Sequence, residues 1–329
     1  MLEQLKNKLK IKKMKKKIIV TGGAGFIGSA FINYLLDNFE YNVLCVDKLT
    51  YAGRKNNIKH SVSFLQKDIC DVTSEDLGEF DYIVHFAAES HVDNSISNGL
   101  PFIRTNVEGT FNLLEISRKN KNLKKFIHIS TDEVYGDMDE HFSINHIASE
   151  EDNLCPSSYY SSSKASSDLL VISCNRTYGL PYLITRTCNN FGEHQFEEKF
   201  LPTIAKSIKN RIPVPIYGDG KQVREWMYVY DNVKVICDLM FDDKVVNEIY
   251  NIGTSFRVTN LDIVKKISEI LETDVIIKNV DDRLGHDRKY ALHCFKMKQY
   301  YINKRVEVPE FLNLFDYLEK TYKVYEKDI

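Results

Sequence analysis

A hydroxyl and two carboxylates stand in a row directly after an apolar run of the chain. Residues 126–130 (FIHIS) are typical of a buried strand, and Thr131, Asp132 and Glu133 follow at once. Two close carboxylates resist ionising together, so one keeps its proton and the pair can supply both an acid and a base. Neighbouring side chains of a strand point to opposite faces, so the chain must leave the sheet here if both carboxyls serve one substrate. The alternative is that the two carboxyls cap a loop or form ion pairs.

A tyrosine and a lysine four residues apart, Tyr160 and Lys164, share one face of a helix predicted over 159–179. A phenol with a pKa of about 10 is a poor base at neutral pH. An ammonium group held nearby stabilises the phenolate and lowers this pKa. The pair therefore indicates proton removal from a hydroxyl whose carbon gives hydride to a nicotinamide. The alternative is that Lys164 is an ordinary solvated lysine.

A glycine-rich turn, TGGAGFIG at 21–28, connects a strand predicted over 16–22 to a helix predicted over 26–39. Glycines at these spacings close the turn, admit a pyrophosphate to the backbone and let the helix pack on the strand. The first turn of the helix then offers N–H groups to the phosphates. A tight turn without a ligand is the alternative. The loop residues expected to bind the cofactor are Gly22, Gly25, Phe26, Ile27 and Gly28.

An acidic residue, Asp47, ends the next predicted strand, 41–47. Its carboxylate can bond a ribose hydroxyl and would repel a 2′-phosphate, which favours NAD over NADP although Lys48 follows directly. The other expected cofactor contacts are Lys48, Thr50, Asp68, Ile69, Ala87, Ala88, Glu89 and Asn106, together with Tyr160 and Lys164.

The elements that must position these residues alternate between apolar strands and amphipathic helices. Further strands are predicted over 62–68 and 80–88, a helix over 102–120 and a strand over 181–186. This alternation predicts an α/β fold, a doubly wound Rossmann-type parallel sheet with a smaller C-terminal substrate lobe. The expected divisions are a lysine-rich extension (1–15), an NAD-binding domain (16–188, with a return of the chain around 225–252) and a mainly substrate-binding lobe (189–329).

The composition excludes several classes of protein. The 329 residues are 43% hydrophobic and carry a formal net charge of −2, which predicts a packed core and argues against a nucleic-acid binder. The seven cysteines include no CxxC pair, so we expect no metal site and a reducing, cytoplasmic environment. No apolar run approaches the roughly 18 residues that a membrane span needs.

The motifs in their order resemble an extended short-chain dehydrogenase/reductase, from the glycine loop through Asp47 to Tyr160-x-x-x-Lys164. One branch of that family is more similar than the others. HFAAESHVDNSI (85–96), STDEVYGD (130–137), PIYGDGKQVREWMYV (215–229) and DRLGHDRKYAL (282–292) look like segments of nucleoside-diphosphate-glucose 4,6-dehydratases. The resemblance extends over roughly residues 16–325.

The resemblance implies oxidation of the sugar at C4, loss of water across C5 and C6, and reduction at C6, with one enzyme-bound NAD. It implies that Tyr160 takes the O4 proton beside Thr131, that Asp132 is the acid for O6 and that Glu133 is the base for C5. It also implies dTDP-glucose or UDP-glucose as substrate, rhamnose-type deoxysugar synthesis as the setting, and a homodimer formed through the helices 102–120 and 159–179. The implied substrate-binding residues are His91, Thr131, Asn190, Lys199, Arg224, Asn251, Arg283 and His286.

Two departures from the family pattern, FGEHQF (191–196) and Leu284, leave the preferred nucleobase open. A 4-epimerase or decarboxylase of the same fold is the nearest alternative, but neither needs the two adjacent carboxyls. A non-catalytic NAD-binding sensor or scaffold is the alternative from another class.

Overall fold

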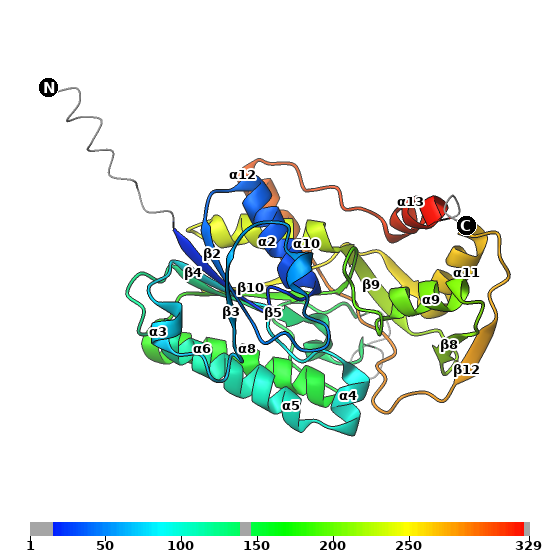
Figure 1. Cartoon of the computed structure of the whole chain (residues 1–329), viewed down its shortest axis with the longest axis horizontal. Helices are drawn as coiled ribbons and strands as arrows, with labels where there is room; N and C mark the ends of the chain where they lie inside the picture. Colours follow the sequence, from blue (N-terminus) through cyan, green and yellow to red (C-terminus); the bar gives the residue numbers. More distant parts are fainter. Residues whose placement is uncertain (1–15, 139–145, 326–329) are drawn as a thin grey trace, which may run out of the picture.

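The structure, a computed structural model, describes residues 16–138 and 146–325 (Figure 1). The extension predicted over residues 1–15 lies outside the described residues.

A seven-stranded parallel sheet forms the centre of the larger domain, in the order β10-β6-β5-β4-β1-β2-β3. The order reverses beside β1, which pairs with β2 on one side and β4 on the other, and ligands of such sheets bind at this switch point. The strands are β1 (Lys17–Thr21), β2 (Asn42–Asp47), β3 (Ser63–Gln66), β4 (Tyr82–His85), β5 (Lys125–Thr131), β6 (Tyr182–Thr187) and β10 (Glu248–Ile252).

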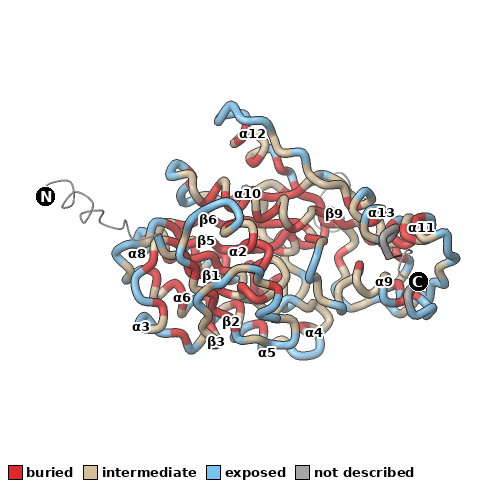
Figure 2. The backbone as a smooth tube through the Cα atoms, turned by 45° about the horizontal axis from the view of Figure 1, so that its top comes forward, coloured by how far each residue is buried: buried red, intermediate tan, exposed pale blue. Residues whose placement is uncertain are grey.

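Helices cover both faces of this sheet, because side chains on both faces of its strands are apolar. Along β1, Ile18 and Val20 belong to one core cluster and Ile19 belongs to the other. The first cluster includes residues of α2 (Phe26–Asn38), α10 (Val229–Phe241) and α12 (Phe295–Lys304); the second includes residues of α6 (Thr110–Ser117) and α8 (Tyr159–Tyr178). Figure 2 shows the buried residues concentrated along the central strands. The doubly wound Rossmann-type fold is confirmed.

The helix predicted over 102–120 is not one α-helix. It is divided into α5 (Leu100–Phe102), a π-helical turn, η2 (Ile103–Gly109), and α6. Inside the π-helical turn, the Asn106 side chain bonds both the backbone N–H and the carbonyl of Glu89, and also the Ser163 hydroxyl. These contacts with other elements oppose a regular helix, and π-helical turns are frequent where side chains serve a function.

The smaller lobe surrounds its own core, which includes Phe191, Ile204, Trp226 and Ile263. One of its sheets contains β7 (Asn189–Phe191), β9 (Val223–Tyr228) and β11 (Arg257–Thr259), and the other contains β8 (Val214–Tyr217) and β12 (Ile277–Val280). Its helices are α9 (Phe200–Lys209), α11 (Asn260–Ile270) and α13 (Leu314–Tyr325). Between these elements the chain returns to the larger domain, where β10 pairs with β6, and α12 later contacts β10.

Short elements complete the fold between the strands. They are η1 (Lys55–Asn57), α3 (Ser74–Leu77), α4 (Val92–Ser97) and η3 (Asp132–Tyr135).

Candidate active site

A cavity of about 340 Å³ opens at the carboxyl ends of the central strands and extends to the smaller lobe. It is lined by residues that lie far apart in the sequence, which the parallel sheet brings to one edge. The predicted site residues that line it are Gly22, Gly25, Phe26, Ile27, Gly28, Asp47, Lys48, Thr50, Asp68, Ile69, Ala87, Ala88, Glu89, Thr131, Asp132, Glu133, Tyr160, Lys164, Asn190 and Lys199.

The glycine loop forms a cradle that side chains would fill. Gly22 has a φ of +69°, and a Cβ there would lie 2.5 Å from the Ala87 nitrogen, two residues beyond β4. A Cβ on Gly28 would lie 2.2 Å from the carbonyl oxygen of Gly22. Gly25 is the N-cap of α2 and supplies no side-chain cap, so the N–H groups of the first turn remain for a phosphate. The loop therefore fits the pyrophosphate of a dinucleotide.

The charges at the end of β2 favour a ribose with free hydroxyls. Asp47 accepts hydrogen bonds from the Ala24 and Leu49 backbone N–H groups, at 2.9 and 2.8 Å, which hold its carboxylate in place. Each carboxylate oxygen can accept a further bond, so a ribose hydroxyl can still be bound. Lys48 could attract a 2′-phosphate, but its ammonium group donates to Asp68 at 2.7 Å. The positive charge of Lys48 is therefore already paired.

Asn106 lies beneath the cofactor cavity rather than in its lining. It is 1% exposed, and its amide bonds to the segment after β4 and to Ser163 on α8. Asn106 therefore holds the backbone of Glu89, and Glu89 lines the cavity.

The chain leaves the sheet at Asp132, as the sequence predicts. Thr131 ends β5 and caps the turn η3, where its hydroxyl accepts from the Glu133 N–H at 3.3 Å and donates to Asp132 at 3.2 Å. In a strand, neighbouring side chains would point to opposite faces. Because the chain turns here, Thr131, Asp132 and Glu133 all line the same cavity.

The two carboxyls differ in how strongly they hold a proton. Burial raises the pKa of Asp132 well above its ordinary value, and the nearby charges of Glu133 and Glu225 raise it further. Burial also raises the pKa of Glu133, but Arg283 and Arg224 oppose this rise. At neutral pH Asp132 is therefore the better proton donor of the two and Glu133 the better acceptor.

Tyr160 and Lys164 lie on the first turns of α8, which begins after a capping box formed by Ser158 and Ser161. The Lys164 ammonium is 4% exposed and donates to the Ile129 carbonyl on β5 at 2.7 Å. Burial lowers the pKa of Lys164 to about 8, against an opposing effect of Asp168.

The sequence predicts a lowered pKa for Tyr160, but in this structure the pKa is raised instead. Burial raises the pKa of the phenol, and the charge of Glu133 adds to that rise. The ammonium of Lys164 bonds a backbone carbonyl instead of the phenol. A cation brought in by a bound cofactor would favour the phenolate, because an opposite charge nearby stabilises the ionised form.

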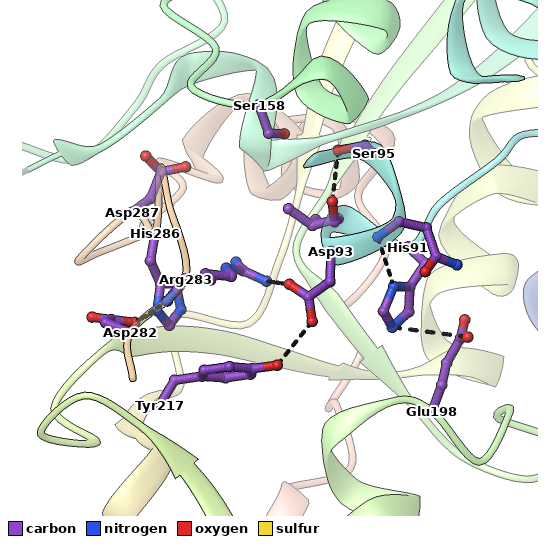
Figure 3. A network of polar contacts seen from close by, with 12 residues as sticks. His91, Asp93, Ser95, Ser158, Glu198, Tyr217, Asp282, Arg283, His286 and Asp287 are labelled. Atoms are coloured by element: carbon purple, nitrogen blue, oxygen red, sulfur yellow. Dashed lines mark hydrogen bonds and ion pairs between the residues drawn. The ribbon is translucent and has the colours of Figure 1, made fainter. Parts of the chain in front are cut away.

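Two of the predicted substrate-binding residues, Arg283 and His286, belong to a polar network between the two lobes (Figure 3). Arg283 lies 3.7 Å from Asp93 of α4, and the Tyr217 hydroxyl of β8 donates to the same carboxylate at 3.0 Å. His286 contacts Asp282 at 2.5 Å, but burial, with the charge of Arg283, lowers the pKa of His286 to about 4. At neutral pH His286 is therefore uncharged, and among these residues Arg283 supplies the positive charge.

Three other predicted substrate-binding residues, Lys199, His91 and Arg224, have different hydrogen-bond partners. Lys199 donates to the Ser90 carbonyl at 3.0 Å beside the cavity, and His91 caps α4 by accepting from Asn94. The buried Arg224 guanidinium donates to two carbonyls and stacks on the Tyr290 ring, 4.3 Å from its centroid.

Asn251 is not brought to the cavity. It is 0% exposed on β10, where it accepts from the Tyr135 hydroxyl at 2.8 Å and donates to the Ala148 carbonyl at 2.9 Å. The amide is thus satisfied within the core, and the residue has a structural position.

A buried tyrosine that the sequence reasoning missed lies against the carboxyls. The hydroxyl of Tyr290 is 3.5 Å from Glu133 and donates to Asp287. Its position in the quoted segment 282–292 was a signal, but an isolated tyrosine there could equally belong to a core. The cavity is also lined by Tyr51 and Glu198, which the sequence did not assign to the site, and by His194, Gln195 and Phe196 of the departing segment 191–196.

Among residues 16–138 and 146–325, no group of three or more His, Cys, Asp or Glu side chains could hold a metal ion. No helix in this described part of the chain is long and apolar enough to span a membrane.

The fold and the cavity define a class of protein, and a family model agrees with both. The model of the NAD dependent epimerase/dehydratase family matches residues 18–253, so the chain belongs to this family.

Within the family, several relatives are dehydratases. The chain is 40% identical over 314 residues to a dTDP-glucose 4,6-dehydratase of Escherichia coli, with 86% of each chain covered. It is 44% identical over 290 residues to the low-salt glycan biosynthesis protein Agl12 of Haloferax volcanii, with 85% of this chain and 91% of that protein covered.

Solved structures agree with these relatives. The structure of DesIV, a dTDP-glucose 4,6-dehydratase of Streptomyces venezuelae crystallised with NAD, matches with a TM-score of 0.87 and 36% identity over 95% of this chain and 97% of that one. A UDP-glucuronic acid 4-epimerase of Bacillus cereus, also with NAD, has a TM-score of 0.86 but 27% identity, over 95% of this chain and 100% of that one. The resemblance to the 4,6-dehydratases is confirmed, and NAD is the cofactor.

Proposed function

We propose that this protein is an NAD-dependent nucleotide-sugar 4,6-dehydratase. It converts dTDP-glucose or UDP-glucose into the corresponding 4-keto-6-deoxy sugar nucleotide and water. The observation that carries the proposal is that Asp132 and Glu133 line one cavity with Tyr160 and Lys164, with the proton held more strongly by Asp132.

The arrangement separates the proton transfers among named side chains. Tyr160 takes the proton of O4, and Thr131 lies beside it to hydrogen-bond that oxygen. Glu133 removes the C5 proton, whose acidity the neighbouring C4 ketone raises. Asp132 gives its proton to O6, which leaves C6 as water. A proton returned to C5 completes the product.

The cofactor supplies the redox chemistry: when bound, NAD accepts hydride from C4 and returns it to C6. The chain's own residues hold and orient it through the glycine cradle, the end of β2 and the alanines that follow β4. The buried Lys164 provides a positive charge close to the reacting groups.

An epimerase or decarboxylase would need the tyrosine, the lysine and the cofactor but not an acid and a base for elimination. Burying two adjacent carboxyls costs stability, so a protein without use for them would not be expected to keep both inside a cavity. The carboxyl pair therefore favours dehydration over these alternatives and over a non-catalytic sensor.

The substrate diphosphate is assigned to the edge of the cavity between the lobes. Arg283 and Lys199 bring positive charge there, and an arginine suits a diphosphate because its planar fork can donate two parallel bonds. His91, Asn190, Arg224 and His286 are assigned supporting contacts.

We assign a homodimer formed through α5, η2, α6 and α8. Large apolar side chains are exposed on these helices, and four examples are Leu100, Ile103, Phe111 and Leu169, from 46% to 74% exposed.

A cytoplasmic location and a role in rhamnose-type deoxysugar synthesis belong to the same proposal. The seven free cysteines, most of them buried, are consistent with a reducing compartment.

The direct test is to incubate the purified protein with dTDP-glucose and UDP-glucose separately and to follow the 4-keto-6-deoxy products. Product from either sugar supports the proposal, and the ratio of kcat/KM values identifies the preferred base. Formation of the C4 epimer without loss of water would instead support the epimerase, and no change in either sugar would contradict both enzymes.

A further inference from the structure

Beneath the cavity, a chain of buried polar side chains connects three elements of the larger domain. Arg186 on β6 is 3% exposed, Asp168 on α8 is 0% exposed and Tyr135 in η3 is 1% exposed. The Arg186 Nε donates to Asp168 at 3.0 Å, and a terminal nitrogen of the same guanidinium donates to the Tyr135 hydroxyl at 2.9 Å. None of the three lines the cavity.

Other groups face this chain and fix its geometry. The Tyr135 hydroxyl donates onward to Asn251 at 2.8 Å, and the Arg186 guanidinium lies 4.9 Å from the centroid of the Tyr135 ring. On the other side, a nitrogen of His128 lies 3.4 Å from Asp168. Burial lowers the pKa of His128 to about 4, so this imidazole is neutral and Arg186 is the cation opposite Asp168.

The two ends of the chain lie on the two elements that carry the reacting groups. Asp168 is on the helix that bears Tyr160 and Lys164, one turn beyond the lysine. Tyr135 is in the four-residue turn that bears Asp132 and Glu133. The planar guanidinium can hold both ends at fixed angles, which a lysine ammonium cannot do.

A buried ion pair is weak evidence for stability, because desolvation offsets much of the attraction between the charges. The same contacts can instead hold two parts of an active site at a fixed position relative to each other. Small displacements of reacting groups cost large factors in rate, so this relative position matters for catalysis.

We propose that Arg186 is a positioning residue that fixes the elimination pair, Asp132 and Glu133, relative to the oxidation pair, Tyr160 and Lys164, through Tyr135 and Asp168. The inference rests on the proposed dehydratase function. It predicts that breaking the Tyr135 end disturbs elimination while oxidation at C4 continues.

Tyr135→Phe removes the hydroxyl that joins the turn to Arg186 and leaves Arg186 on Asp168. We expect kcat to fall about tenfold, the effect of one buried hydrogen bond, with KM within about twofold of the wild type. Because oxidation then outpaces elimination, reduced cofactor should accumulate during turnover and be visible by its absorbance.

The matched control is Tyr301→Phe on α12. Tyr301 is 3% exposed, and its hydroxyl donates to Asp238 at 2.8 Å, far along the chain from the reacting groups. This variant should lose a comparable hydrogen bond without accumulating reduced cofactor.

Arg186→Lys provides a second measurement if Tyr135→Phe does not fold. It keeps a positive charge beside Asp168 but lacks the fork that reaches both partners, so the same accumulation is expected. If product and reduced cofactor fall in parallel in the folded variants, the positioning role is wrong.

Hydrogen exchange gives a readout that does not depend on turnover. In Tyr135→Phe the amides of residues 131–136 should exchange about tenfold faster, while those of 163–175 stay within about twofold. Equal acceleration in both segments would contradict the inference. Failure of the wild type to convert either sugar would instead contradict the proposed function, and the exchange result would still decide whether the bridge holds the turn.

Discussion

At the scale of single residues, Asp132 and Glu133 are neighbours in the chain but meet different charges in the fold. Burial raises the pKa of both carboxyls and Arg224 opposes both rises, but the charges of Glu133 and Glu225 raise the pKa of Asp132 further, whereas Arg283 opposes the rise at Glu133. This difference assigns the proton to one carboxyl and leaves the other to act as a base. The different roles of the two carboxyls therefore depend on charged side chains of the smaller lobe, such as Glu225 and Arg283, near the end of β5.

Glu133→Gln tests the base role. The amide cannot accept the C5 proton, so solvent exchange at C5 should fall at least about 100-fold, the usual contribution of a general base. Oxidation at C4 should continue and leave reduced cofactor on the enzyme. The measurement is deuterium incorporation at C5, with Glu248→Gln as a control because Glu248 pairs with Lys296 outside the cavity. Normal exchange in Glu133→Gln would remove it from this role.

The pH dependence of kcat/KM tests the charge of Lys164. Burial lowers the pKa of this lysine to about 8, so the ammonium form is present below that pH and is lost above it. We expect kcat/KM to decline as the pH rises through about 8. Lys164→Arg stays charged throughout, so its profile should lack this decline even if its activity is lower. A decline that persists in Lys164→Arg would assign it to another group, such as Asp132.

At the scale of elements, the glycine loop is constrained by contact with other parts of the backbone. Gly28→Ala would place a methyl group 2.2 Å from the Gly22 carbonyl oxygen, so the loop must shift. NAD affinity should fall at least about tenfold and Tm should fall as well, because overpacking costs about 1–3 kcal/mol.

Gly179→Ala is the matched control, at the end of α8. Gly179 has a φ of +73° and nothing within 4 Å of an added Cβ, so the substitution strains only the local backbone. Thermal denaturation should show a loss of about 1 kcal/mol, whereas titration with NAD should give the wild-type affinity. Equal loss of NAD affinity in both variants would contradict the cradle.

Sequence patterns suffice for elements whose cause is local. Continuous apolar runs such as Ile18–Val20 indicate a strand covered on both sides, and the structure confirms it. The π-helical turn could not be predicted, because it coincides with contacts that Asn106 makes with Glu89 and Ser163 from other elements. For the same reason a motif could locate Asn251 but could not show that its amide faces Tyr135 rather than the cavity.

At the scale of the whole molecule, the exposed apolar side chains of α6 and α8 allow a test of the proposed dimer. Phe111 on α6 and Leu169 on α8 are 53% and 57% exposed. Changing both to Asp should convert the proposed dimer to a monomer, because charges are costly at the core of an interface. Sedimentation measures the change. Ile302→Asp on α12, at a residue 55% exposed, should leave the dimer intact. Unchanged mass in the double variant would place the interface elsewhere.

The return of the chain to the central sheet has a consequence for synthesis on the ribosome. The strand β10 forms one edge of the sheet and pairs with β6. The helices α10 and α12 pack on one face of the sheet. A nascent chain that has reached residue 188 therefore exposes the edge of β6 together with buried apolar residues such as Leu183. The cofactor domain can finish folding only after residues up to 304 have emerged, although its motifs end more than a hundred residues earlier. A nascent chain of intermediate length is thus a natural client for a chaperone.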